Sequence, residues 1–107
     1  MQINLSYKNK EYTLEYNRQG VTAMEAQGFN ISEVSDKPMT RIPQLFYGAF
    51  TKNHRGIKRS LVDEIYDNIS DKSGLIQALV ELYADTLNTL MEDSEGSEGN
   101  ATWEMKR

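Results

Sequence analysis

The sequence predicts an α+β fold, mostly α, in which an N-terminal β-hairpin precedes a small bundle of about four helices and a disordered acidic C-terminal tail. Three observations lead to this expectation. Apolar and polar residues alternate on both sides of a short polar turn near the N-terminus. Apolar residues then recur every three or four positions in later segments. Finally, residues 92–102 contain no apolar residue larger than Ala. We therefore expect one domain over residues 1–91 and a flexible tail over residues 92–107.

The hairpin is expected over about residues 2–16. Lys8–Lys10 supplies a polar turn in which Asn9 can take a positive φ. The alternating apolar residues on its two sides are Ile3, Leu5, Tyr7, Tyr12, Leu14 and Tyr16. Two strands alone are barely stable in water, so one face of the hairpin must pack on the helices that follow.

Local signals place the first helix and the loop after it. Thr22 and Glu25 have the spacing of a capping box, in which each side chain satisfies a backbone N–H of the first turn. Gly28 can end this helix in the left-handed conformation. The polar segment 32–41 contains Pro38 and predicts a loop.

The second and third helices are placed by similar signals. Pro43 predicts the start of the second helix, because its missing N–H costs nothing in a first turn. The segment Asn53–Gly56 should end that helix. Ser60 and Asp63 should open the third, on which apolar residues recur every four positions.

The fourth helix is the clearest element and should follow Ser70–Gly74. One apolar stripe consists of Ile76, Val80, Tyr83, Leu87 and Leu90, and a second of Leu75, Leu79 and Leu82. A helix that is apolar around so much of its circumference is normally central to a bundle or seated in an interface. Central packing is the default expectation, and Tyr83 and Leu87 are the candidates for contact with a partner.

Two interpretations apply to Trp103, which stands near the end of the acidic tail. The acidic segment cannot bury enough apolar surface to offset its ordering entropy, so it should be a linker. Trp103 and Met105 then resemble a small docking element at the end of that linker. Alternatively, a lone terminal Trp folds back onto its own domain. Under the first interpretation Trp103 is a candidate protein-binding residue.

Composition excludes several classes of protein. The chain has 107 residues, the size of one domain, and no cysteine, which excludes disulfides, thiolate zinc sites and cysteine nucleophiles. No run of apolar residues approaches the roughly 18 of a membrane span, and the N-terminus lacks the apolar core of a signal peptide. We expect a cytoplasmic protein without membrane contact.

Charge is distributed unevenly along the chain. Residues 1–60 carry nine Lys or Arg and five Asp or Glu, a net charge of +4. Residues 61–107 carry three and eleven, a net charge of −8. The asymmetry suits a charged partner or head-to-tail contact between copies in a homo-oligomer, because opposite ends attract. The alternative is a dipolar surface without consequence.

A basic cluster carries much of the positive charge and consists of Lys52, Arg55, Lys58 and Arg59. Contact with an acidic segment of a partner or of a neighbouring copy is the favoured interpretation, so all four are candidate protein-binding residues. Phosphate binding also needs such charge. However, the pI of about 5.0 and the acidic downstream half make nucleic acid an unlikely partner.

No residue pattern predicts catalysis, a cofactor or a metal. His54 is the single histidine, and Lys or Arg residues surround it in the sequence without a nucleophile motif or a phosphate-binding loop. An exposed histidine that closes a helix is the expected role. Asp63 and Asp67 lie one helical turn apart, which more often marks a solvated face than a magnesium or calcium site. We expect a protein that is not an enzyme.

Several segments, taken in order, resemble a known family. They are Tyr12–Tyr16, Met24–Ile31, Lys37–Thr40, Leu45–Phe50, Glu64–Asp67 and the terminal Trp103–Met105 after an acidic stretch. Together these are similar to small tail assembly chaperones of siphophages and prophages of Gram-positive bacteria. The resemblance covers nearly the whole chain.

The resemblance implies a role in phage morphogenesis in the host cytoplasm. Such chaperones are thought to coat the long, largely helical tape-measure protein and to recruit tail-tube subunits around it. They often occur in a short form and a longer, frameshifted form. The main competing expectation is a structural tail component retained in the virion, and a nucleic-acid-binding regulator comes third.

Overall fold

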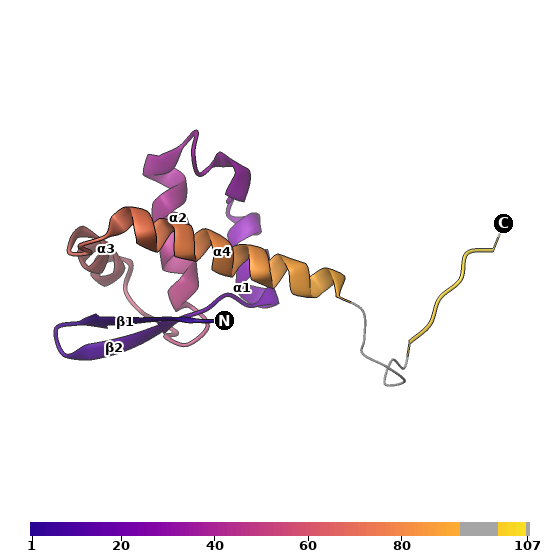
Figure 1. The fold of residues 1–107 in the computed structure, drawn as a ribbon, viewed down its shortest axis with the longest axis horizontal. Helices are drawn as coiled ribbons and strands as arrows, with labels where there is room; N and C mark the ends of the chain where they lie inside the picture. The colour runs from indigo at the N-terminus through magenta and orange to yellow at the C-terminus, as the bar shows by residue number, and fades with distance from the viewer. Residues whose placement is uncertain (93–100, 107) are drawn as a thin grey trace.

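The computed structural model describes residues 1–92 and 101–106, and it confirms the predicted hairpin followed by four helices (Figure 1). The elements are β1 (Ile3–Tyr7), β2 (Lys10–Leu14), α1 (Arg18–Ala26), the 3₁₀ helix η1 (Ile31–Glu33), α2 (Pro38–Phe50), α3 (Arg59–Asp67) and α4 (Lys72–Met91). Of the predicted tail, residues 93–100 and 107 lie outside the described part. Residues 101–106 have no helix or strand. The division into a domain and a tail stays a prediction.

The hairpin has the register that its alternation requires. Leu5 pairs with Tyr12 across the two antiparallel strands. Lys8 and Asn9 have φ of 49° and 64°, which is the geometry of a tight two-residue hairpin turn. The Glu15 N–H, just after β2, donates to the carbonyl oxygen of Ala49 at 3.0 Å. A backbone hydrogen bond therefore joins the hairpin to the C-terminal end of α2.

The capping-box prediction for α1 was wrong. The helix begins at Arg18, and the side chain of Asn17 accepts a 2.7 Å hydrogen bond from the N–H of Gly20. Thr22 lies inside the helix, where its hydroxyl donates to the carbonyl of Arg18 at 2.8 Å. Asn at an N-cap is as effective as Ser or Thr, so the signal was present five residues earlier in the sequence, at Asn17.

The predicted start of α2 was also wrong, because the helix begins at Pro38 and contains Pro43 inside it. The segment 32–41, expected to be a loop, therefore contains the end of η1 and the first turn of α2. Pro43 is the sixth residue of the helix, and a proline there removes one backbone hydrogen bond and crowds the carbonyl four residues before it. Two other contacts hold this turn. The Arg41 N–H donates to the carbonyl of Lys37 at 2.9 Å, and the Arg41 guanidinium meets the Glu33 carboxylate at 3.0 Å.

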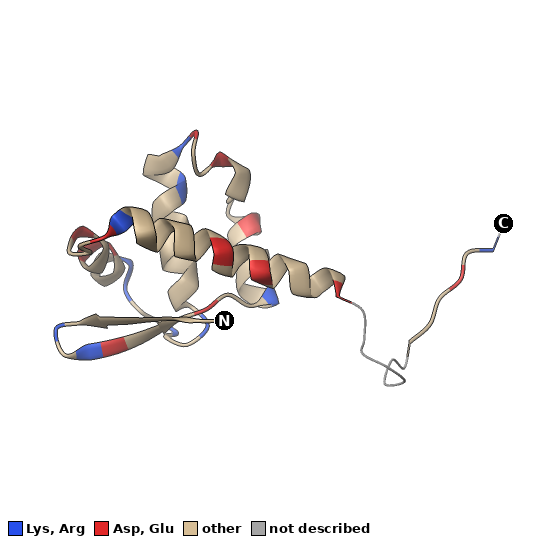
Figure 2. Cartoon of the chain, viewed as in Figure 1, with Lys and Arg blue, Asp and Glu red and all other residues tan. Residues whose placement is uncertain are grey.

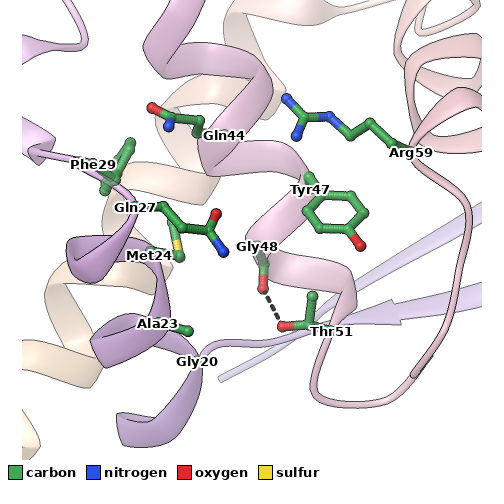
Figure 3. Close-up of a pocket in the computed structure, with 10 residues that line it drawn as sticks. All are labelled: Gly20, Ala23, Met24, Gln27, Phe29, Gln44, Tyr47, Gly48, Thr51 and Arg59. Carbon is green, nitrogen blue, oxygen red and sulfur yellow. Dashed lines mark hydrogen bonds between the residues drawn. The ribbon is translucent and has the colours of Figure 1, made fainter.

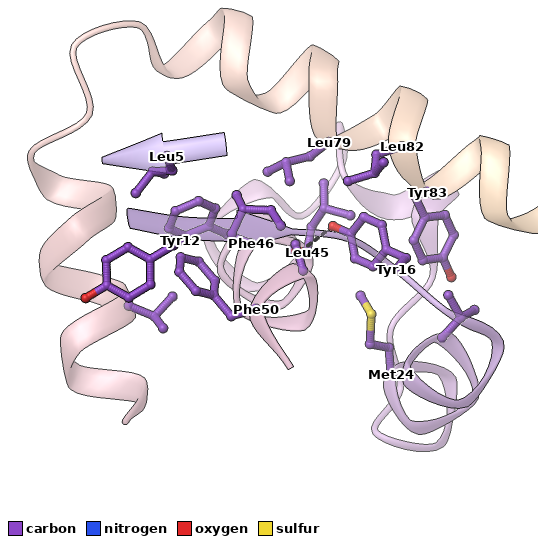
Figure 4. Packing of buried hydrophobic residues seen from close by; sticks show 14 of the residues in the cluster. Leu5, Tyr12, Tyr16, Met24, Leu45, Phe46, Phe50, Leu79, Leu82 and Tyr83 are labelled. Carbon is purple, nitrogen blue, oxygen red and sulfur yellow. Dashed lines mark hydrogen bonds between the residues drawn. The ribbon is translucent and has the colours of Figure 1, made fainter. Parts of the chain in front are cut away.

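The core lies where the hairpin and helices α1, α2, α3 and α4 meet, and aromatic rings form much of it (Figure 4). Phe46 and Phe50 pack edge to face at 5.0 Å, and Tyr83 of α4 packs against Tyr16 at 5.3 Å. The buried Tyr16 hydroxyl donates to the carbonyl of Leu45 at 2.5 Å. Burial raises the pKa of Tyr16 well above its ordinary value.

Candidate protein-binding surfaces

The C-terminal end of α4 carries exposed apolar side chains. Leu79, Leu82 and Tyr83 are buried, whereas Leu87, Leu90 and Met91 are 37%, 57% and 81% exposed. The boundary lies at Thr86, whose hydroxyl donates to the carbonyls of Leu82 and Tyr16 at 3.2 and 3.4 Å. Beyond it, the helix extends past α1 (Figure 1). We call Leu87, Leu90 and Met91 the α4 surface.

The α4 surface continues into a shallow groove of about 100 Å³ against α1. From the α1 side it is lined by Arg18, Val21, Thr22 and Glu25. Leu87 and Leu90 line it from α4. A side chain from a partner could thus contact both helices at once.

The charged side chains that α4 contributes near this surface are acidic, while Arg18 of α1 supplies a cation at the groove. After Lys72 the chain has no Lys or Arg until Lys106, while Glu81, Asp85 and Glu92 lie on the exposed side of α4 (Figure 2). The last turn of α4 contains no basic residue. Because the C-terminal end of a helix carries partial negative charge, this arrangement strengthens rather than neutralises the local field.

A second apolar surface lies between α2 and α3, and we call it the α2–α3 groove. Its volume is about 360 Å³. The lining residues are Pro38, Met39, Ile42, Pro43 and Phe46 from α2 and Asp63, Tyr66 and Asp67 from α3. Met39 stands 89% exposed at its edge, so this groove combines apolar side chains with two carboxylates.

The predicted basic cluster lies on the loop between α2 and α3 and at the first residue of α3. Lys52 meets the Glu15 carboxylate at 2.9 Å, and Arg59 meets Asp63 at 3.6 Å. The Arg59 guanidinium also lies 5.0 Å from the centre of the Tyr47 ring. Two of the four cations are therefore paired within the chain.

The other two cations of the cluster have no ion pair with a described residue. Arg55 and Lys58 line a hollow of about 310 Å³ together with Lys10 from the hairpin. Sequence inspection did not associate Lys10 with them, because 45 positions or more separate them in the chain. This hollow is the part of the basic cluster open to an acidic group.

His54 is partly buried and joins the same loop to the hairpin. Its Nε2 accepts a 3.0 Å hydrogen bond from the Thr13 N–H, and its ring packs edge to face on Tyr12 at 5.1 Å. The side chain of Asn53 also donates to Glu15 at 3.0 Å. Hydrogen bonds from Lys52 and Asn53 lower the pKa of the Glu15 carboxyl. The loop is thus fixed against β2.

The structure separates the three remaining candidates. It corrects the expectation for Tyr83, whose ring is 2% exposed and belongs to the core, so a partner cannot reach it. Leu87 is exposed, as a binding residue must be. Trp103 is 85% exposed and does not pack on the domain. Sequence inspection missed Met39 and Met91, which are 89% and 81% exposed; the only available signal was an apolar residue at a helix end.

A cavity between α1 and α2 is too small to be a site. Its volume is about 50 Å³, room for a few water molecules, whereas ligand pockets start at about 300 Å³ (Figure 3). The Thr51 hydroxyl beside it donates to the carbonyl of Gly48 at 3.0 Å.

In the described part of the chain, no three His, Asp or Glu side chains gather as metal ligands would. No described helix is both long and apolar enough to cross a membrane.

Comparison with known proteins identifies a family. A family model described as Domain of unknown function (DUF5055) matches residues 1–106. The chain belongs to this family. No curated protein and no solved structure matches it. The range matched by the DUF5055 model includes the α4 surface, the α2–α3 groove and Trp103.

Proposed function

We propose that this DUF5055 protein is a protein-binding module that acts as a phage tail assembly chaperone, with the α4 surface as the contact for its partner. The observation that carries the proposal is the exposure of Leu87, Leu90 and Met91 at the end of a helix that carries no Lys or Arg after Lys72. Such a surface fits an amphipathic helix that presents apolar side chains with Lys or Arg beside them.

Three physical arguments support a helical, basic partner. An apolar stripe on one helix is normally covered by a second helix packed along it. The groove beside Leu87 and Leu90 offers a place for a side chain of that second helix. The negative C-terminal end of α4 favours a cation of the partner at that end, whereas the groove itself carries one carboxylate, Glu25, and one cation, Arg18.

The resemblance to tail assembly chaperones names a partner of this kind. Their tape-measure proteins are long and largely helical, so many copies of a small module could line up along one. The proposal therefore takes the tape-measure protein as the main partner, tail-tube subunits as the proteins recruited, and the host cytoplasm as the location.

The test is binding to the tape-measure protein encoded beside this chain. We expect the two proteins to copurify after co-expression, and Leu90→Asp to lower the affinity at least about tenfold, since burial of one Leu contributes about 2 kcal/mol. Gln77→Asp is the matched control, because it adds the same charge at an exposed position of α4 away from the surface. Equal binding by both variants would exclude the α4 surface.

A structural tail component is the alternative, and the fate of the protein after assembly separates the two. A chaperone leaves the tail, so mass spectrometry of purified virions should not detect the chain. Its presence at a fixed ratio to the tail-tube protein would favour the structural role, with the same α4 surface retained as a permanent joint.

A further inference from the structure

We propose that the α2–α3 groove binds the C-terminal segment of a second copy of this chain. The segment comprises residues 101–107, of which 101–106 are described, and we call it the terminal segment. Its apolar side chains occupy the groove and its cations lie beside the groove's carboxylates. This contact links copies to one another, and it uses neither Leu87 nor Leu90.

The size of the groove matches side chains rather than a whole helix. At about 360 Å³ it lies near the lower limit of pockets that take small ligands. Its apolar walls come from Ile42, Pro43 and Phe46 on α2 and from Tyr66 on α3. One large aromatic side chain with a neighbouring aliphatic one would fill it.

The terminal segment carries such a pair in exposed positions. Trp103 is the single tryptophan of the chain and is 85% exposed, and Met105 is 65% exposed. Tryptophan is among the residues that contribute most to protein interfaces when a pocket takes it. An exposed Trp and an open apolar groove thus occur in the same molecule without contact between them.

The terminal segment has more cations than carboxylates, and the groove has two carboxylates. The segment carries Lys106 and Arg107, the only cations of the chain after Lys72, and one carboxylate, Glu104, whose Oε1 lies 3.9 Å from the Lys106 Nζ. Asp67, at the edge of the groove, forms no ion pair with any described residue, and Asp63 has only the 3.6 Å contact with Arg59. Insertion of Trp103 would bring the cations three and four residues after it next to these carboxylates.

The geometry of α4 favours a second copy over the chain's own segment. Lys72, at the start of α4, contacts the carbonyl of Asp67 at 3.4 Å, so the groove lies near that end. The helix has 20 residues and carries the chain about 30 Å away before the terminal segment follows. A contact from one end of a copy to the other end of the next is heterologous, and it links copies into a ring or an open row according to the rotation between them.

The fluorescence of Trp103 can report whether this side chain is buried, because the chain has no other tryptophan. We expect the emission of the full chain to shift to the blue as protein concentration rises, in parallel with association measured by sedimentation velocity. Trp103→Ala should abolish the association. A blue-shifted emission that does not depend on concentration would show docking within one chain and overturn the proposal, as would association of the Trp103→Ala variant at unchanged strength.

A labelled peptide of residues 101–107 then locates the binding site. The receptor is the full chain with Trp103→Ala, which has no competing tryptophan. We expect this receptor to bind the peptide, and Met39→Asp in the same chain to weaken binding at least about tenfold, since it places a charge at the edge of the groove. Met91→Asp is the matched control, because it changes an equally exposed methionine on the α4 surface.

A charge exchange completes the test. Asp67→Lys in the receptor should weaken binding of the peptide, and Lys106→Glu in the peptide should restore part of it. Equal binding by the Met39→Asp and Met91→Asp receptors, or no rescue by the exchange, would exclude the groove. These outcomes are independent of the proposed function, because Leu90→Asp changes partner binding only and Met39→Asp changes self-association only.

Discussion

The two halves of α4 have the same apolar periodicity and opposite environments. From Leu75 to Tyr83 the helix packs against the aromatic core, and its buried residues are at most 2% exposed. From Leu87 to Met91 comparable side chains face solvent, and Arg18 and Glu25 of α1 line the groove beside them. A single helix therefore provides both the centre of the fold and a free surface. Apolar side chains in the first half maintain the fold, and those in the second half are available for binding.

The largest difference should appear when one leucine is truncated in each half. Leu79→Ala removes a fully buried side chain and should lower the free energy of unfolding by about 2–5 kcal/mol. Leu90→Ala should change it by less than about 0.5 kcal/mol, because the side chain is already exposed. Urea denaturation followed by circular dichroism measures both. Equal losses would show that the end of α4 belongs to the core.

His54→Ala should have an intermediate effect on the free energy of unfolding, because His54 is only partly buried. The variant leaves the Thr13 N–H without its acceptor and removes ring contacts with Tyr12, at a cost of about 1–2 kcal/mol. Asn88→Ala is the control, because it changes an exposed polar residue on the free half of α4. If thermal melts of the two variants coincide, the loop is not fastened to β2 through His54.

A smaller effect is expected on the pH dependence of the free energy of unfolding, through Glu15. The pKa of Glu15 is lowered in the folded state, so its contribution to stability is present above the ordinary glutamate pKa of about 4.3 and is lost as the pH falls below it. Glu15→Gln should lower the free energy of unfolding at pH 7 by under about 1 kcal/mol and should reduce the loss between pH 6 and pH 3. Asp85→Asn, a change on the free half of α4, should leave that loss as in the wild type.

The smallest effect on the stability of the domain is expected from deletion of residues 92–107. Trp103 is 85% exposed and contributes no core contact, so the thermal transition should stay nearly unchanged at low protein concentration. Differential scanning calorimetry provides the measurement. A decrease of several degrees would mean that the tail folds back onto the domain and that α4 is less exposed than the structure indicates.

The start of α2 and the role of His54 are two features that the neighbouring residues in the sequence do not predict. Pro43 has the chemistry of a first helical turn, yet the contact between Arg41 and Glu33 stabilises an earlier start at Pro38. His54 was interpreted as an exposed helix end because nothing in the sequence shows that Thr13, 41 positions away, donates to it. Thr13 and His54 are too far apart for any sequence window to contain both, and Glu33 and Arg41, although only eight positions apart, lie in two elements that share no periodicity.

The sequence by itself determined the hairpin, the presence of four helices and the charge asymmetry, because alternation, helical spacing and charge are properties of neighbouring residues. Only the tertiary structure decided which part of each apolar stripe is buried. Tyr83 and Leu87 lie one turn apart on the same face of α4, but Tyr83 packs on Tyr16 and Phe29 whereas Leu87 lies where α1 only partly covers the helix. A stripe identifies the face of a helix that can be buried; the length and position of the elements packed against it decide how far the burial extends.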